Sequence, residues 1–302
     1  MPQIIQFLHP GPEAILPRGL NILPWNCGNI HKRKFLLSKG KYVSNNSEED
    51  ACLTFWGEWE PQSYVERLPN LGQHYPSYLN RPFLDVTVPD RCHNTDPYVF
   101  GVSFKYFICQ QGVKKILRNL DPLSLILFGS CIEGKFCLDT LFVVSDRQVK
   151  YKKTKVNKLG KKNTVFYPAS IEPLLNEKYC EKIKCNSVED EYTYYEGITF
   201  NDRKQFKNIF SFAPSMIYKN QNDTNFAFQR PAIEIPEIIS PRQTQSINGN
   251  GGRNYSVEEI VNVWHKIVDT INKKNLVLGT HFEEPVKTSI KKVISDKNIF
   301  KC

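Results

Sequence analysis

The chain has 302 residues, of which 40% are hydrophobic and 24% are charged, a composition typical of a soluble globular protein. This length allows one large domain or two ordinary ones, and no window approaches the roughly 18 uninterrupted apolar residues of a transmembrane helix. The net charge of +9 favours a polyanionic partner such as nucleic acid. The alternative is that a lysine-rich chain is simply well solvated.

Nine cysteines occur at irregular spacing, and several lie inside apolar runs. This pattern predicts reduced thiols in a cytoplasmic protein and not a disulfide framework. Residues 1–17 lack the features of a signal peptide. Cys180 and Cys185 form a weak zinc pair without a second pair, so the sequence assigns no metal and identifies no cofactor.

The first predicted strand spans residues 3–8 and ends at the turn His9-Pro-Gly-Pro-Glu13. A basic cluster, His31-Lys-Arg-Lys34, then precedes an apolar run. Residues 52–56 predict a second strand that leads into Phe55-Trp-Gly-Glu-Trp-Glu-Pro61. Loops at strand ends commonly present functional side chains, and both His9 and His31 have such positions.

The stretch from Phe55 to Pro61 interleaves two tryptophans with two carboxylates. In an extended strand Trp56, Glu58 and Glu60 point one way and Trp59 points the other. One interpretation is a ligand wall, in which an indole stacks on a flat ring and a carboxylate accepts its N–H donors. The other is a strand whose tryptophans belong to the core.

Proline recurs between Pro61 and Asp96, which predicts a long loop with little regular structure. The turn Asn94-Thr-Asp-Pro97 follows it and leads into a β-prone run from Val102 to Cys109. Residues 123–128 and 136–144 predict two buried strands. Asp139 interrupts the second of these, and a buried acid must be paired, hydrogen-bonded or protonated. A structural role and a site role both stay open for it.

Eight lysines and arginines and no acid occur between Arg147 and Lys162. This density suits contacts with phosphates, through Lys150, Lys152 and Lys153, and equally suits an exposed loop. The run divides the chain into residues 1–146, a candidate ligand or active-site region, the basic loop 147–162, and a β-rich region 163–302. All three parts could belong to one integrated domain.

The C-terminal part predicts strands at residues 164–167 and 191–200, a Gly/Asn connector at 248–252, and a helix from Ser256 to about Asn275. Ser256 and Glu259 form a capping box, and an apolar stripe includes Ile260, Trp264 and Ile271. We therefore expect an α+β fold with a mixed, β-rich core, long ordered loops and this amphipathic helix packed on the sheet.

No standard catalytic motif is present, so the candidate residues come from the unusual polar clusters. A histidine beside carboxylates suits acid–base catalysis, and an arginine or lysine suits phosphate. The candidate catalytic residues are His31, Glu58 and Asp96. The candidate ligand-binding residues are Trp56, Trp59, Glu60, Arg33 and Asn94, and the candidate phosphate-binding residues are Lys34, Lys150, Lys152 and Lys153.

Four segments, His9–Glu13, His31–Phe35, Phe55–Pro61 and Asn94–Pro97, resemble bacterial nucleotide-modification-associated proteins. The resemblance covers roughly residues 5–145 and identifies no catalytic residue. It implies DNA-base modification and phage defence, including 7-deazaguanine systems, with partner proteins of a modification or defence cluster.

Three functional hypotheses follow, of which one is a defence or interaction protein whose polar and aromatic clusters are only core and salt bridges. The other two involve a base or a nucleotide. The first is an enzyme that modifies a purine-like base of nucleic acid, held in an aromatic and carboxylate pocket. The second is a non-catalytic module that recognises a nucleotide or modified base in a bacterial defence system. Both expect DNA or a nucleotide as the partner, no membrane partner and a cytoplasmic location.

Overall fold

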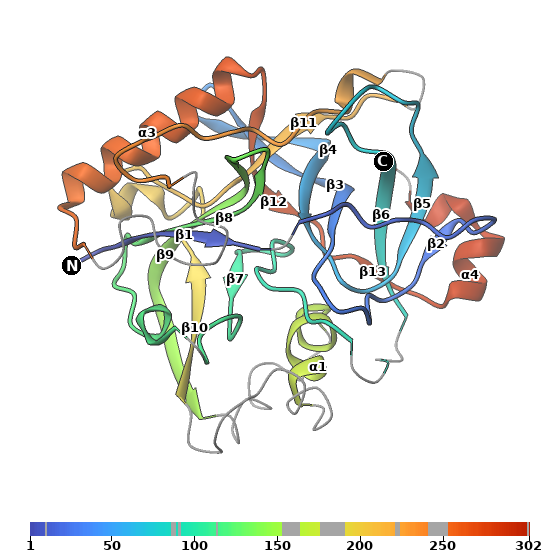
Figure 1. Ribbon diagram of the computed structural model, residues 1–302, viewed down its shortest axis with the longest axis horizontal. Coiled ribbons are helices and arrows are strands. Elements are labelled where there is room, and N and C mark those ends of the chain that lie inside the picture. The colour runs from blue at the N-terminus through green and yellow to red at the C-terminus, as the bar shows by residue number, and fades with distance from the viewer. Residues whose placement is uncertain are drawn as a thin grey trace.

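The computed structural model describes residues 1–9, 11–85, 89, 92–112, 114–152, 164–175, 191–220, 224–240, 253–300 and 302. The fold is α+β, as the sequence predicts, and its strands form two sheets that lie side by side (Figure 1). The basic residues 153–162 and the connector 248–252 lie outside the described residues, as do Cys180 and Cys185.

The first sheet has five strands in the order β1-β8-β9-β10-β7. β1 is parallel to β8, and the other neighbours are antiparallel. The strands are β1 (Ile4–Leu8), β7 (Lys105–Tyr106), β8 (Leu125–Ile132), β9 (Lys135–Lys152) and β10 (Glu191–Gly197). Side chains alternate between its two faces: Leu125 and Leu127 enter one hydrophobic cluster, and Ile126 and Phe128 enter the other.

The second sheet is built around a long hairpin of β3 and β4, which pair from Arg33 opposite Glu58 to Ser44 opposite Ser47. Its order is β12-β11-β4-β3-β6-β5-β2, and β12 also pairs with β3, so the pairings among β3, β4, β11 and β12 close on themselves. The bounds are β2 (Ile22–Leu23), β3 (Arg33–Ser44), β4 (Ser47–Glu58), β5 (Ser63–Arg67), β6 (Tyr78–Leu84), β11 (Ala213–Ile217), β12 (Val277–Phe282) and β13 (Val286–Lys287), which pairs with β6.

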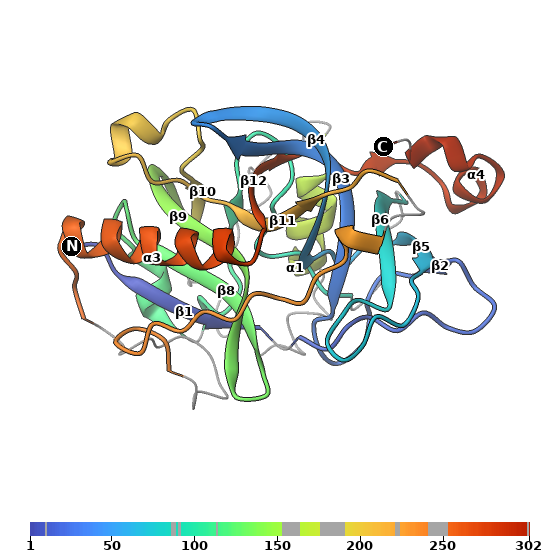
Figure 2. The ribbon, with the colours of Figure 1, turned by 90° about the horizontal axis from the view of Figure 1, so that it is seen from above.

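The long helix α3 (Val257–Lys273) covers one face of the first sheet, as Figure 2 shows from above. Ser256 and Glu259 form the predicted capping box, and Ile260, Trp264 and Ile267 are buried. The indole N–H of Trp264 donates to the carbonyl of Phe210 at 2.9 Å. The predicted helix is therefore confirmed in its cap, its apolar stripe and its packing on the sheet.

The remaining helical segments are short. They are α1 (Glu172–Leu175), α4 (Ile290–Ser295), one π-helical turn (Tyr167–Ile171) and 3₁₀ turns at Lys115–Arg118, Arg203–Phe206, Thr224–Phe226 and Lys297–Phe300. In the part of the chain that is described, no helix is long and apolar enough to cross a membrane.

Two sequence predictions about local structure are wrong. The proline-rich stretch after Pro61 contains β5 and β6. Pro82 lies within β6 opposite Ser63, and the strand pairing continues on through the next four residue pairs. Residues 164–167 are not a strand but lead into the π-helical turn. In both stretches tertiary packing overrides local propensity.

We predict that Trp264→Ala lowers the free energy of unfolding by about 3–5 kcal/mol, because it removes a buried indole from the contact between α3 and the sheet. Urea denaturation followed by circular dichroism measures this loss. Asn262→Ala, at an exposed position of the same helix, is the control and should change little. Equal effects of the two substitutions would contradict the packing described here.

Candidate functional site

The candidate site lies where the ends of the two sheets meet, and it is organised around the carboxylate of Glu58. Glu58 is the last residue of β4, and Arg33, the first residue of β3, lies directly opposite it. His9 follows the end of β1 in the first sheet, and its backbone N–H donates to the carbonyl of Gly129. His31 approaches from the loop before β3. The fold therefore brings together three of the sequence motifs through the ends of β1, β3 and β4.

Glu58 is buried, and each of its oxygens has two partners. Oε2 lies 2.8 Å from Nδ1 of His9 and 2.7 Å from Nη1 of Arg33. Oε1 lies 3.1 Å from Nδ1 of His31 and accepts the backbone N–H of Asp96 at 3.1 Å. A buried carboxylate is stable only when it is paired and hydrogen-bonded in this way.

The two histidines on Glu58 differ in charge. Burial alone would lower the pKa of His31, but the carboxylates of Glu58 and Glu60 more than offset this and raise it to about 10. For His9 burial prevails over the attraction of Glu58, and its pKa is lowered. Burial favours the neutral acid of Glu58, yet His31 and His9 hold its pKa well below the usual value. At neutral pH the site therefore combines an imidazolium, a neutral imidazole and a carboxylate.

The rings of His9 and His31 stack with parallel planes, and their centroids are 5.2 Å apart. His9 is almost completely buried, whereas the side chain of His31 keeps 15% of its surface exposed. His31 is thus the member of the pair that a ligand can reach directly. His9 contacts a residue that the sequence prediction missed, because its Nε2 lies 3.1 Å from Sγ of Cys109.

Asp139 extends the network on the side of the first sheet. Its neighbours Leu138 and Thr140 pair with consecutive residues of β8, so Asp139 occupies a bulge in β9. A bulge redirects a side chain, and here the carboxylate accepts Nε of Arg33 at 2.8 Å. Nε of Arg230 lies 3.7 Å from the other carboxylate oxygen, Oδ1 of Asp139. The buried acid in the strand is therefore paired, one of the solutions that the sequence left open.

Glu60 joins the site from the other side of His31. Its Oε1 lies 2.8 Å from Nδ1 of His31, and its Oε2 accepts the side-chain amide of Asn26 at 2.7 Å. Glu58 and Glu60 thus converge on one imidazole, as strand alternation predicts. The ring of His93 lies 4.4 Å from that of His31 and completes the surroundings of His31.

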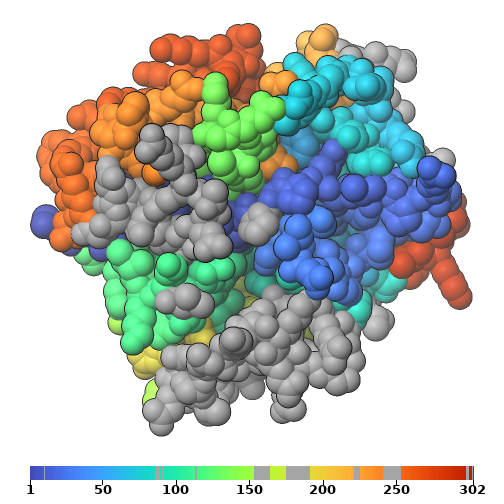
Figure 3. Space-filling view, viewed as in Figure 1, coloured from blue at the N-terminus to red at the C-terminus, as the bar shows by residue number. Residues whose placement is uncertain are grey.

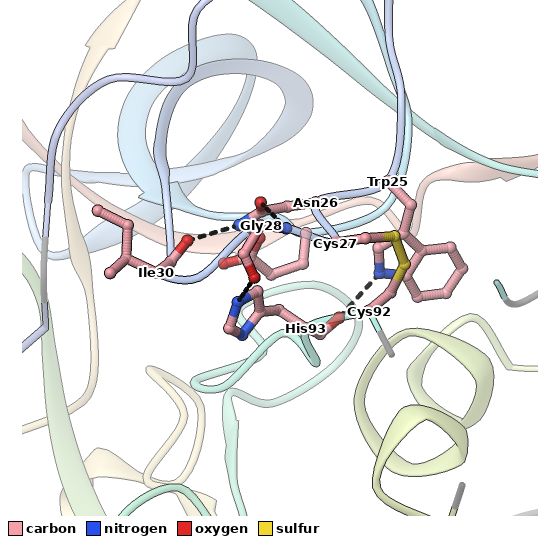
Figure 4. The surroundings of a disulfide bond; sticks show 8 residues. Trp25, Asn26, Cys27, Gly28, Ile30, Cys92 and His93 are labelled. Atoms are coloured by element: carbon pink, nitrogen blue, oxygen red, sulfur yellow. Dashed lines mark hydrogen bonds between the residues drawn. A yellow bond between two sulfur atoms is a disulfide. The ribbon is translucent and has the colours of Figure 1, made fainter. Parts of the chain in front are cut away.

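A disulfide between Cys27 and Cys92 links the segments that carry Asn26 and His93 (Figure 4). Beside it the indole N–H of Trp25 donates to the carbonyl of His93 at 2.8 Å. A second disulfide joins Cys52 to Cys302. The expectation of reduced thiols throughout is therefore wrong at these four positions, because the fold brings residues far apart in the sequence into contact.

Asp96 contributes differently from the prediction, which placed it among the catalytic residues. Its two carboxylate oxygens accept the backbone N–H groups of Phe107 and Cys109, at 3.0 and 2.9 Å. Burial raises its pKa well above the usual value, against these hydrogen bonds. Asp96 therefore holds the loop that carries Cys109. Asn94 is buried beside it in the sequence, and its side-chain nitrogen has no hydrogen-bond partner among the described residues.

The prediction that Trp56 or Trp59 stacks on a ligand ring beside Glu58 meets two buried indoles. Trp59 is completely buried, donates its indole N–H to the carbonyl of Gln62 at 2.8 Å and packs on Phe100. Trp56 belongs to the other hydrophobic cluster, because alternation along the strand sends the two indoles to opposite sides. Arg230 covers the ring of Trp56 at 4.5 Å. Neither indole offers an open face beside Glu58.

The predicted phosphate ligands do not converge either. Lys34 is buried, and its ammonium donates to the carbonyl of Pro61 at 2.6 Å and to Ser63 at 3.3 Å. Burial lowers its pKa to about 7. Lys150 and Lys152 are exposed near the far end of β9, and Lys150 is about 35 Å from Asp139 along the strand. Lys153 lies outside the described residues.

A separate open pocket of about 510 Å³ lies on the Arg230 side of the network. In Figure 3 the blue N-terminal segment, the cyan residues near Gly72 and the light green end of the β8–β9 hairpin meet on this face. Its lining includes Glu13, Trp56 and Arg230. A Cβ on Gly11 would overlap the side chain of Ser130, which explains the glycine in the first motif. The volume suits a nucleoside-sized ligand.

The same group of side chains has the composition of a metal site. Among the described residues His31, Glu58 and Glu60 form one group whose ligand atoms lie within 4.8 Å of one another. Their carboxylates, however, already receive Arg33, the two imidazoles and Asn26. We therefore interpret the group as a hydrogen-bonded ion cluster and assign no metal to it.

No protein-family model matches the chain, and no curated protein or solved structure matches it either. The interpretation of the site therefore rests on its geometry and chemistry.

We predict opposite pH dependences for Lys34→Met and His31→Gln. The folded state raises the pKa of His31, so its stabilisation is complete below about pH 6.5 and is lost as the pH rises toward 10. The folded state lowers the pKa of Lys34 from 10.5 to about 7, so its contribution increases as the pH rises through that interval.

Relative to the parent protein, stability should therefore fall more steeply with pH in Lys34→Met and rise more steeply in His31→Gln. Urea denaturation between about pH 7 and pH 9 measures both slopes. Lys273→Met and His265→Gln make the same changes at exposed positions of α3 and should follow the parent. Parallel curves for all variants would refute the assigned shifts.

We also predict that Cys27→Ser lowers the free energy of unfolding by about 2–4 kcal/mol under oxidising conditions, because it removes a cross-link between distant segments. With a reductant present the variant and the parent should become similar. Cys131→Ser, at an exposed free thiol, is the control. A non-reducing digest that lacks the Cys27–Cys92 peptide pair would contradict this disulfide.

Proposed function

We propose that the protein is an enzyme that modifies a purine-like base of nucleic acid or a nucleotide, with His31 as the group that transfers protons during the reaction. The observation that carries the proposal is the convergence of His9 and His31 on the buried carboxylate of Glu58, with only His31 partly exposed. Such a group, fixed by carboxylates and open to a ligand on one side, meets the geometric requirement of general acid–base catalysis, and with a pKa of about 10 it starts the reaction as the acid.

The roles within the site follow from the contacts. His31 donates or accepts the proton, and Glu58 and Glu60 fix its ring and stabilise its charged form. Arg33 and Asp139 balance the charge of Glu58 and hold it in place. The histidine with its two carboxylates therefore replaces the earlier hypothesis of a stacking wall.

Three features support the substrate class. The net charge of +9 favours a polyanion, and Lys150 and Lys152 are exposed, although far from the site. The resemblance to nucleotide-modification-associated proteins indicates base chemistry, with 7-deazaguanine-type bases, DNA modification and phage defence as its setting. A cytoplasmic location belongs to this proposal, in which the two disulfides form within a cytoplasmic protein, an uncommon case.

The pocket beside Arg230 favours a second candidate function, the recognition of a nucleotide or modified base without catalysis. Its volume of about 510 Å³ and its lining by Trp56, Glu13 and Arg230 suit a bound base. In this case the ion cluster around Glu58 would hold the two sheets together, and the pocket would be the functional site.

We predict that the parent protein changes a nucleoside when it is incubated with DNA or nucleotides, and that His31→Gln slows this reaction by about 10²–10⁴-fold. Nucleoside mass spectrometry after digestion measures the reaction, and a binding assay runs in parallel. His265→Gln, an exposed histidine on α3, is the matched control.

Binding without a changed nucleoside would reject the enzyme and favour recognition, which Arg230→Gln should then weaken. No binding of any nucleic acid or nucleotide at low salt would reject both functions. Full activity in His31→Gln would show that another group transfers the proton.

A further inference from the structure

The loop that carries Cys109 is held in one position by contacts on both sides of the residue. Its backbone N–H donates to the carboxylate of Asp96 at 2.9 Å, and its carbonyl accepts the hydroxyl of Tyr106 at 2.7 Å. The flanking residues Ile108 and Gln110 have φ values of 55° and 62°. A β-branched residue rarely adopts this conformation, and such strain concentrates at functional sites.

The fixed thiol points at an oriented histidine. Sγ of Cys109 lies 3.1 Å from Nε2 of His9, and the other ring nitrogen of His9 lies 2.8 Å from Oε2 of Glu58. Nδ1 of His9 lies at ion-pair distance from Glu58 without the alignment of a hydrogen bond, and in the tautomer that carries its proton on Nδ1 the lone pair of Nε2 faces the thiol. This is the order of nucleophile, base and orienting carboxylate that defines an activated nucleophile.

Cys109 packs against the hydrophobic core without being completely buried. Cys109 is partly exposed, although His9 behind it is almost completely buried. Burial raises the pKa of the Cys109 thiol most, and the negative charges of Asp96 and Glu58 raise it further. The thiol therefore does not ionise by itself at neutral pH and depends on a neighbouring base, which His9 supplies.

We propose that Cys109 is a catalytic nucleophile, with His9 as its base and Glu58 as the residue that positions His9, and that it forms a covalent adduct with an electrophilic ring carbon of the substrate. This inference rests on the proposed function for its substrate class, a nitrogen heterocycle such as a purine-like base. The assignment of Cys109 as a nucleophile rests instead on the contact between its thiol and the imidazole of His9.

The step balances without an oxidant or a reductant. Sγ attacks the carbon of a ring C=N bond, so an S–C bond forms while the π bond opens. The proton of the thiol passes to Nε2 of His9. The electron pair of the π bond moves to the ring nitrogen, which takes a proton from His31, whose ring stacks on that of His9. The reverse transfers release the thiol when the adduct breaks down.

The first experiment measures the reactivity of the thiol without any substrate. The full-length protein is treated with iodoacetamide at about pH 7 without reductant, and peptide mass spectrometry follows the alkylation of each cysteine over time. Cys131 is an exposed free thiol and serves as the internal reference. We expect Cys109 to react at a rate similar to that of Cys131, despite its more buried position.

His9→Gln should slow the alkylation of Cys109 by about tenfold or more and leave that of Cys131 unchanged. Cys131→Ser should leave the rate at Cys109 unchanged, as the matched control. A Cys109 that stays unmodified in the parent while Cys131 reacts would overturn the proposal. So would an unchanged rate in a folded His9→Gln variant. Thermal melting establishes folding, and if the variant does not fold, the comparison within the parent decides.

The second experiment separates this inference from the proposed function. The parent, Cys109→Ala and Cys109→Ser are incubated with DNA and nucleotides, and intact-protein mass spectrometry searches for an adduct. A changed nucleoside at the parental rate in both variants would reject the nucleophile and leave the proposed function intact. Histidine-dependent alkylation without any changed nucleoside would reject the proposed function and leave the reactive thiol intact.

Discussion

The site and the junction of the two sheets depend on the contacts of one buried carboxylate, that of Glu58. It receives an imidazole from the end of β1, a second imidazole from the loop before β3, the guanidinium of Arg33 and the backbone of Asp96. Removing one partner from a buried ion cluster leaves an uncompensated charge, so the loss of any one of these contacts destabilises the fold. The polar groups of the site therefore also hold the fold together.

This dependence explains why the charged groups of the site differ so much in their pKa. His31 lies between two carboxylates and is held protonated, whereas His9 is deeper and stays neutral. Lys34, one position along β3 from Arg33, points the other way, and its hydrogen-bond partners among the described residues are the carbonyl of Pro61 and the hydroxyl of Ser63. Two neighbours in a strand thus have different electrostatic environments, since alternation sends one to the ion cluster and the other to a buried position where desolvation outweighs the attraction of Glu60.

The bulge at Asp139 and the loop around Cys109 show how backbone irregularities complete the site. In a regular β9 the carboxylate of Asp139 would lie elsewhere, and Arg33 would lose the partner of its Nε. In a relaxed loop Cys109 would not meet His9. Each irregularity is held by buried hydrogen bonds, so the rigidity that stabilises the fold also fixes the distances on which the chemistry depends.

The sequence by itself determined those features that depend on local patterns. The period and cap of α3, the buried strands around Phe128 and Phe142, and the convergence of Glu58 and Glu60 at the end of β4 all follow from residue order. It also placed His31, Arg33 and Glu58 among the candidate residues, because charged groups at strand ends are unusual enough to be noticed.

Tertiary structure alone decided which distant groups meet. The contact of Cys109 with His9 spans 100 residues, and that of Arg33 with Asp139 spans 106. No periodicity encodes such a pairing, because it depends on how the two sheets pack. The same holds for the disulfides, for the burial of Lys34 and Trp59, and for the change of Asp96 from a predicted catalytic acid to the anchor of a loop. Local sequence indicates which residues are candidates for a functional site, and the packing of distant segments determines which side chains they contact.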